Sequence, residues 1–168
     1  WQPRATALAS GLVLATLALT GHAAMMVGPL GALHGANDVV HVLSSGAWFG
    51  ALLPLATILG RGGPSTARLH QEAALRTFSV AGHLAVALAI VTGLANTYLV
   101  VGGWPTDWSS PYQALLSLKV GLVLVMVTIA CINRYRHVPR MAEDRPGALA
   151  SIRRGAIGEI TIGTVVFG

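Results

Sequence analysis

Charged side chains are scarce in this sequence. Only 10% of its 168 residues are Asp, Glu, Lys or Arg, against roughly 25% in an ordinary soluble domain. Hydrophobic residues make up 54%, and the mean hydropathy is +0.65. A soluble protein of this length needs a charged surface that so few residues cannot build. The composition therefore excludes an ordinary soluble domain and predicts an integral membrane protein.

Cysteine is almost absent as well. The single cysteine, Cys131, excludes an internal disulfide, and the sequence has no CxxC or zinc-type spacing. It also lacks a nucleophile elbow, a phosphate-binding loop and paired carboxylates at a plausible spacing, so we expect no enzyme. The net charge of +5 would suggest nucleic acid in a soluble protein. In a membrane protein it instead reflects arginine in cytoplasmic loops, so no nucleic-acid partner is expected.

Long apolar runs rich in Ala, Leu, Gly and Val fill most of the sequence. They are long enough for helices that cross a bilayer, which takes about 20 residues, and they lack the alternation of barrel strands. The predicted fold is an all-α membrane protein, a multi-span helical bundle forming one transmembrane domain. We expect four complete spans and the start of a fifth, with Pro54 kinking the second. Their approximate bounds are 5–28, 36–59, 77–101, 112–133 and 155–168.

The ends of the sequence predict that it is a fragment of a longer membrane protein. It begins with Trp1 rather than an initiator methionine, and it stops at Gly168 inside an apolar run. We do not interpret the first run as a cleaved signal peptide, because it is too long and has no cleavage site.

Basic residues predict the orientation. All except Lys119 precede the first span or lie in the loops after the second and fourth spans, and the other two loops, 29–35 and 102–111, contain none. Because loops rich in arginine stay in the cytoplasm, these loops of the multi-pass, lipid-embedded chain are predicted to be cytoplasmic. Trp104 and Trp108 lie in an opposite loop, where an interfacial aromatic belt would place them.

A cluster of potential metal ligands is predicted at the outer ends of the first two spans. His22 lies ~25 Å above the inner end of span one, and His41 lies ~27 Å above that of span two, so the two are level. Asp38 is three residues before His41 and on the same helix face. Imidazole and thioether ligands suit copper, and thioethers favour Cu(I). The predicted site draws on His22, Met25, Met26, His34 (in the outer loop), Asp38 and His41.

Other polar residues are predicted at different depths. His83 and Glu159 lie ~10 Å and ~8 Å from the cytoplasmic side, so a buried pair is expected there. A structural hydrogen bond and a transport or proton-relay role both stay open for that pair. Lys119 is ~12 Å from the outer end of span four, with Asn96 and Thr97 as expected polar neighbours.

Taken in order, short motifs make the sequence resemble the CopD copper-resistance membrane proteins. The first are Gly21-His22-Ala23, Asp38-x-x-His41 and Ala47-Trp48-Phe49-Gly50, followed by Arg76-x-Phe78-Ser79 and Thr92-Gly93. Later ones are Tyr112, Leu116-x-x-Lys119, Asn133-Arg134, Pro139-Arg140 and Glu159. The resemblance covers about residues 20 to 160.

The resemblance implies copper transport or handling across the inner membrane, in copper homeostasis and resistance, beside a periplasmic CopC-like copper carrier. It points to His22, Asp38 and His41, with Lys119 and Glu159 as further pattern positions. Two alternatives stay open. One is a b-type haem-binding membrane cytochrome, with His22 and His41 as axial ligands, and the other is an assembly factor that delivers copper to an oxidase. The sequence does not indicate an oligomeric state.

Overall fold

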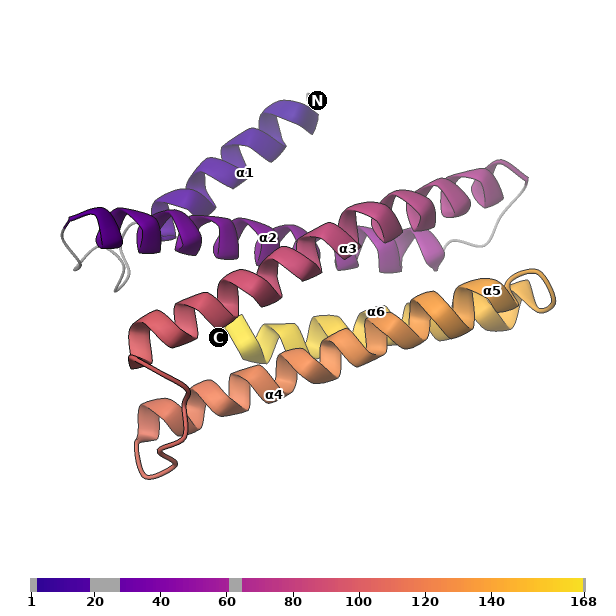
Figure 1. Cartoon of the computed structure of the whole chain (residues 1–168). Coiled ribbons are helices and arrows are strands. Elements are labelled where there is room, and N and C mark those ends of the chain that lie inside the picture. Colours follow the sequence, from indigo (N-terminus) through magenta and orange to yellow (C-terminus); the bar gives the residue numbers. More distant parts are fainter. Residues whose placement is uncertain (1–2, 19–27, 61–64, 168) are drawn as a thin grey trace.

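The computed structural model describes residues 3–18, 28–60 and 65–167, and every regular element in these ranges is a helix (Figure 1). The helices are α1 (Pro3–Ala18), α2 (Pro29–Leu59), α3 (Ser65–Val101), α4 (Pro111–Ile132), the π-helix η2 (Asn133–His137), α5 (Val138–Arg140) and α6 (Arg145–Phe167). The predicted all-α class is confirmed for this part of the chain.

Three helical segments are long and apolar enough to cross a membrane: Pro29–Leu59, Arg68–Val101 and Pro111–Arg140. The prediction of four complete spans and a fifth is not confirmed by the described residues. In α1 the apolar stretch covers only Ala5–Thr16, and residues 19–27 lie outside the described part. In α6 the charged side chains of Arg153, Arg154 and Glu159 interrupt the apolar sequence.

Two helices begin earlier than predicted. The second begins at Pro29 rather than near residue 36, because proline suits the first position of a helix and Gly28 precedes it with φ 88°. His34 therefore lies inside α2 and not in an outer loop, which corrects the prediction. The third begins at Ser65, twelve residues before the predicted start at 77, so a polar helical extension precedes the apolar segment.

The long helices alternate in direction, which gives the bundle two chemically distinct ends. At the arginine end lie the C-terminal end of α2, the start of α3 and the connection from α5 to α6, and at the tryptophan end lies the connection from α3 to α4, with Trp104 and Trp108 (Figure 1). Helix α2 packs against α3 and α6, and α4 packs against α6. Helix α1 crosses α2 obliquely (Figure 1).

The buried core joins α2 to α6. Leu52 and Ala56 contact Ala156, and Phe49 and Phe78 pack around them. A second cluster, nearer the arginine end, contains Leu55, Leu59 and Ile152. Gly163 allows α6 to approach closely, since a Cβ atom there would collide with the ring of Phe49. This core joins α2, which packs against α3, to α6, which packs against α4.

A π-helical turn interrupts the helix that runs from Pro111 to Arg140. Pro139 has no N–H to donate to the carbonyl group of Tyr135, and its ring would clash with that carbonyl in an α-helix. The wider turn η2 spans Asn133–His137 and relieves this conflict. Sequence analysis did not predict this turn, although Pro139 was the signal for it.

Candidate functional site

His41 lies on the face of α2 that packs against α3, and its imidazole is held by α3. The Nδ1 atom is 3.0 Å from the carbonyl oxygen of Ala89 and 3.1 Å from Oγ1 of Thr92. A carbonyl oxygen can only accept, so Nδ1 carries the proton and donates. The hydroxyl group of Thr92 donates to the carbonyl oxygen of Leu88 at 2.5 Å, which leaves Oγ1 free to accept from His41.

This arrangement selects the tautomer of His41. With the proton on Nδ1, the neutral imidazole keeps an unshared electron pair on Nε2. Metal-bound histidines show this pattern, because they donate the other ring N–H to a carbonyl group or carboxylate that fixes the ring's orientation. The structure thus presents His41 as a ready ligand through Nε2.

Gly93 provides the space that this ring occupies. A Cβ atom at position 93 would lie 3.0 Å from Cε1 of His41 and 3.4 Å from Nδ1. The absence of a side chain therefore lets the imidazole lie directly against α3. This close approach gives a physical reason for glycine within the Thr92-Gly93 motif.

One helical turn before His41, three polar side chains form a chain of hydrogen bonds. Asn37 donates through Nδ2 to Oδ1 of Asn96 at 2.7 Å and to the carbonyl oxygen of Thr92 at 2.9 Å. Asn96 donates through Nδ2 to Oδ1 of Asp38 at 2.9 Å. The Asp38 carboxylate is thereby oriented by α3. Asn96, predicted as a neighbour of Lys119, instead orients Asp38.

A cavity of about 340 Å³ begins at His41 and extends between α3 and α4. We call it the His41 cavity. Its polar lining is His41, Ser45, Thr97 and Lys119, and Trp48 forms part of its wall. Lys119 is exposed in the described part of the chain, yet it lines the same cavity as His41. Thr97, the other expected polar neighbour of Lys119, lines the same cavity.

Not every predicted ligand can be placed. His22, Met25 and Met26 lie outside the described residues. His34 is 3% exposed and lies two helical turns before His41. Within the described ranges, no three His, Cys, Asp or Glu side chains converge in a way that could hold a metal ion. The described part of the predicted site therefore consists of a pre-oriented His41 with Asp38 one turn away.

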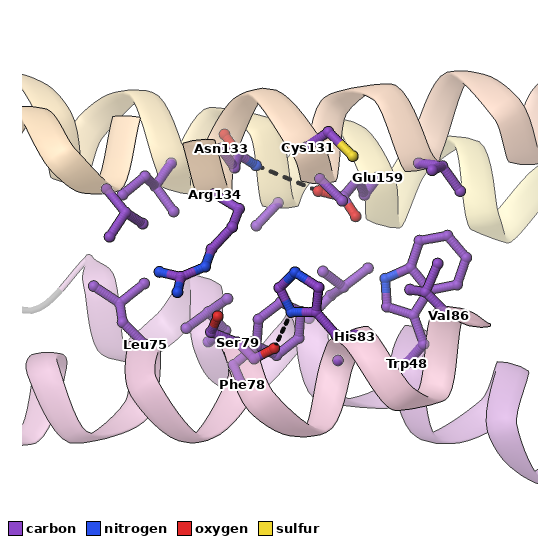
Figure 2. Close-up of a pocket in the computed structure, with 18 of the residues that line it drawn as sticks. Trp48, Leu75, Phe78, Ser79, His83, Val86, Cys131, Asn133, Arg134 and Glu159 are labelled. Carbon is purple, nitrogen blue, oxygen red and sulfur yellow. Dashed lines mark hydrogen bonds between the residues drawn. The ribbon is translucent and has the colours of Figure 1, made fainter. Parts of the chain in front are cut away.

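A second cavity, of about 270 Å³, lies nearer the arginine end and is lined by His83 and Glu159 (Figure 2). We call it the Glu159 cavity. The expected His83–Glu159 pair is not found. His83 is exposed, and its ring bonds to the carbonyl oxygen of Ser79 and, through Nε2, to the hydroxyl group of Tyr135 at 3.1 Å. Glu159 is 2% exposed and accepts a hydrogen bond from Asn133 at 3.3 Å.

Trp48 joins the two cavities, and sequence analysis assigned it no role. It is 5% exposed and lines both of them, together with Ile90 and Val127. Asn133 was also assigned no role, because the π-helical turn that begins there was not predicted. Both residues occur in the quoted motifs, Ala47-Trp48-Phe49-Gly50 and Asn133-Arg134, and this was the available signal.

The sequence matches a protein-family model and several known proteins. Residues 72–168 match the family model described as "CopD: Copper resistance protein D". The chain is 38% identical over 136 residues to "Inner membrane protein YebZ" of Escherichia coli (strain K12), covering 79% of this chain and 45% of that protein. It is 37% identical over 131 residues to "Copper resistance protein D" of Pseudomonas syringae pv. tomato, covering 76% and 42%.

A more distant relative is "Copper transport protein CutJ" of Bacillus subtilis (strain 168), at 28% identity over 127 residues, with 73% and 22% covered. The chain thus spans less than half the length of each of these relatives. No solved structure matches it significantly. Because the family model matches more than half of the sequence, this chain belongs to the copper resistance protein D (CopD) family.

Proposed function

We propose that this chain is part of a protein that transports copper across the bacterial inner membrane, in copper homeostasis and resistance. Membership of the CopD family supports copper as the cargo, as do the printed names of the Pseudomonas and Bacillus relatives. The Escherichia relative, an inner membrane protein by name, supports the location. Three long apolar helices support several passes through the lipid bilayer.

The single observation that carries the proposal is the fixed tautomer of His41. Donation from Nδ1 to Ala89 at 3.0 Å leaves Nε2 available for a metal ion. In the proposed site, His41 and Asp38 bind Cu(I) together with His22, while Met25, Met26 and His34 contribute softer or additional ligands. Copper is the cargo of this site and not the cofactor of a reaction, so the proposal includes no enzymatic activity.

The proposed orientation places the arginine end in the cytoplasm. His41 lies towards the tryptophan end of α2, so its site would face the periplasm. A periplasmic CopC-like carrier could then deliver copper to it. Lys119, which lines the same cavity, would lie on the inward path.

Copper binding by the purified full-length protein tests the proposal. Cu(I), held by a chromogenic chelator, would be titrated against the native protein and the variants His41→Ala, His22→Ala and His70→Ala. His70 is an exposed histidine near the arginine end and serves as the matched control. We expect affinity to fall by more than about 100-fold in His41→Ala, since a direct ligand should matter more than the 10–100-fold of a supporting residue. Unchanged affinity in the His41 and His22 variants would overturn the site.

The same preparation separates copper handling from haem binding. The His41 tautomer would equally suit an axial haem ligand, and haem would give a Soret band in the optical spectrum of the untreated protein. We expect no such band. Copper flux into vesicles containing the full-length protein then separates transport from delivery to an oxidase, because delivery requires binding without flux.

A further inference from the structure

The Glu159 cavity contains a titratable group that the proposed copper site does not use. Most of its lining is apolar, and it lies between α3 and the helix formed by α4 and η2, with α2 and α6 behind it. Glu159 comes from α6, and only 2% of its surface is exposed. Figure 2 shows its carboxyl group on the cavity side of α6, next to Asn133.

This carboxyl group interacts with two side chains, Asn133 and Trp48, and its two oxygens differ. Oε1 accepts a hydrogen bond from Nδ2 of Asn133, whereas Oε2 is buried without a hydrogen-bond partner among the described residues. Burial of an ionised carboxylate is unfavourable, because the surroundings replace only part of its lost hydration. A proton on Oε2 removes that cost, so the structure describes a group whose stable form depends on a proton.

Asn133 is held in place by the backbone of α6. A Cβ atom at Gly155 would collide with the Asn133 amide, so glycine there allows the amide to lie against α6, one turn before Glu159. The π-helical turn begins at this same asparagine. Such turns are frequent at functional sites. The contact with Oε1 is thus built by two elements, α6 and η2.

The mouth of the cavity contains a hydrogen-bonded pair of side chains, a histidine and a tyrosine. His83 and Tyr135 are both exposed and are joined by the 3.1 Å hydrogen bond between Nε2 and the hydroxyl group. The Nδ1 atom of His83 donates to the carbonyl oxygen of Ser79, because that oxygen can only accept. Nε2 of the neutral ring is therefore a proton acceptor that faces Tyr135.

The other groups around Glu159 favour neither protonation state alone. The titratable or charged lining residues are His83 from α3, Cys131 from α4, Arg134 and Tyr135 from η2, and Glu159 itself, while α2 contributes none. Hydrogen bonds from Asn133 and Trp48 favour the ionised carboxylate, whereas burial among apolar walls favours the neutral acid. Opposed influences of this kind suit a site that gains and loses a proton.

We propose that Glu159 is a proton-exchange site that opens to the arginine end past His83 and Tyr135, separate from the His41 site. On uptake, Nε2 of His83 takes a proton from hydronium, which leaves water; the N–H bond then breaks, its electron pair stays on nitrogen, and an O–H bond forms on Oε2 of Glu159. On release, that bond breaks, its electron pair stays on Oε2, and the proton returns to water. The site goes beyond the proposed copper function and does not depend on it.

Infrared difference spectroscopy of the full-length protein without copper tests this site. The pH would be stepped in both directions, and the C=O stretch of a protonated carboxyl group would be identified by its shift in D2O. We expect a buried-type band that appears and disappears reversibly, that is lost in Glu159→Gln, and that persists in Glu72→Gln, whose carboxylate is 56% exposed. A band that persists in Glu159→Gln, or a Glu159 band that never changes with pH, would overturn the proposal.

Asn133→Leu provides a second test if Glu159→Gln does not fold. Loss of the hydrogen bond to Oε1 should shift the band to higher frequency without removing it, and an unshifted band would also overturn the assignment. Tyr135→Phe interrupts the mouth, so the band should reach its final intensity more slowly after each pH step. Since copper is absent throughout, failure here leaves the copper proposal intact, and failure of copper binding leaves this one intact.

Discussion

The two cavities share one wall but hold their polar groups in opposite ways. In the His41 cavity, α3 orients the ligand: Nδ1 of His41 has two acceptors, and Asp38 is bound through Asn96. In the Glu159 cavity, the central carboxyl group keeps one oxygen without a partner in the described structure. Fixed polar groups suit selective binding of an ion, whereas an incompletely paired acid suits exchange of a proton. Burial alone therefore does not indicate what a polar site can do. Which of its polar atoms already have hydrogen-bond partners matters as well.

Among the variants that test this comparison, Asn96→Leu should have the largest effect on stability. The substitution removes the amide that links Asp38 to Asn37, and each buried polar group left unpaired costs about 1–3 kcal/mol. We expect the free energy of unfolding in detergent to fall by that order and copper affinity to fall with it. Thr128→Val is the control, because its hydroxyl group bonds only within α4 and is exposed. Native stability in Asn96→Leu would show that the network near His41 is not structural.

A pair of glycine substitutions should disturb each cavity separately. Gly93→Ala pushes the His41 ring, because the new Cβ atom would lie 3.0 Å from Cε1, and copper affinity should fall about 10-fold, as when a supporting residue is lost. Gly155→Ala displaces Asn133 from Glu159 instead. It should shift the Glu159 infrared band and leave copper affinity unchanged. Equal effects of both variants on copper would mean that the cavities act as one site.

A smaller effect is expected from Thr92→Val. This change removes one of the two acceptors of His41 Nδ1 but keeps the carbonyl oxygen of Ala89. Copper affinity should therefore fall less than the roughly 10-fold expected at the lower limit for an outer residue. Chelator competition would measure it. A loss greater than that of Gly93→Ala would show that Thr92, and not Ala89, fixes the tautomer.

The smallest effect should come from the ion pair outside both cavities. Arg145 and Glu72 lie 2.6 Å apart, with side chains 22% and 56% exposed. Pairs of this kind contribute roughly 0.2–1 kcal/mol and weaken as salt increases. A double-mutant cycle with Arg145→Gln and Glu72→Gln should give a coupling energy in that range. Any change in copper affinity or in the Glu159 band would show that this ion pair is energetically coupled to the cavities.

Sequence reasoning predicted the helical class and the family because both depend on composition and on the order of motifs. The rise per residue predicted the depth of each residue along its helix, and it predicted similar depths for His83 and Glu159. It did not give their rotation about the helix axis, so it could not predict that His83 would bond to Tyr135 and Glu159 to Asn133. A π-helical turn changes that rotation locally, and no simple periodicity includes it.

Helix ends were predicted less well for a related reason. The predicted start of the second span, near residue 36, followed hydropathy and left His34 in the preceding loop. Proline at the first helical position was the better signal, because Pro29 begins α2 and brings His34 into the helix. The partners of His41 were also beyond reach, since Ala89 contributes a backbone oxygen that a side-chain pattern does not reveal.

The position of Trp48 makes its fluorescence a useful probe of both cavities. The chain has four tryptophans, Trp1, Trp48, Trp104 and Trp108. Trp48 is 5% exposed, whereas Trp104 and Trp108 are 60% and 73% exposed. Replacing the other three with phenylalanine would leave Trp48, in the wall between the two cavities, as the one indole emitter of this part of the protein. Its fluorescence would then report on both sides of that wall at once: quenching by an arriving metal ion and a spectral shift when a neighbouring acid changes its charge.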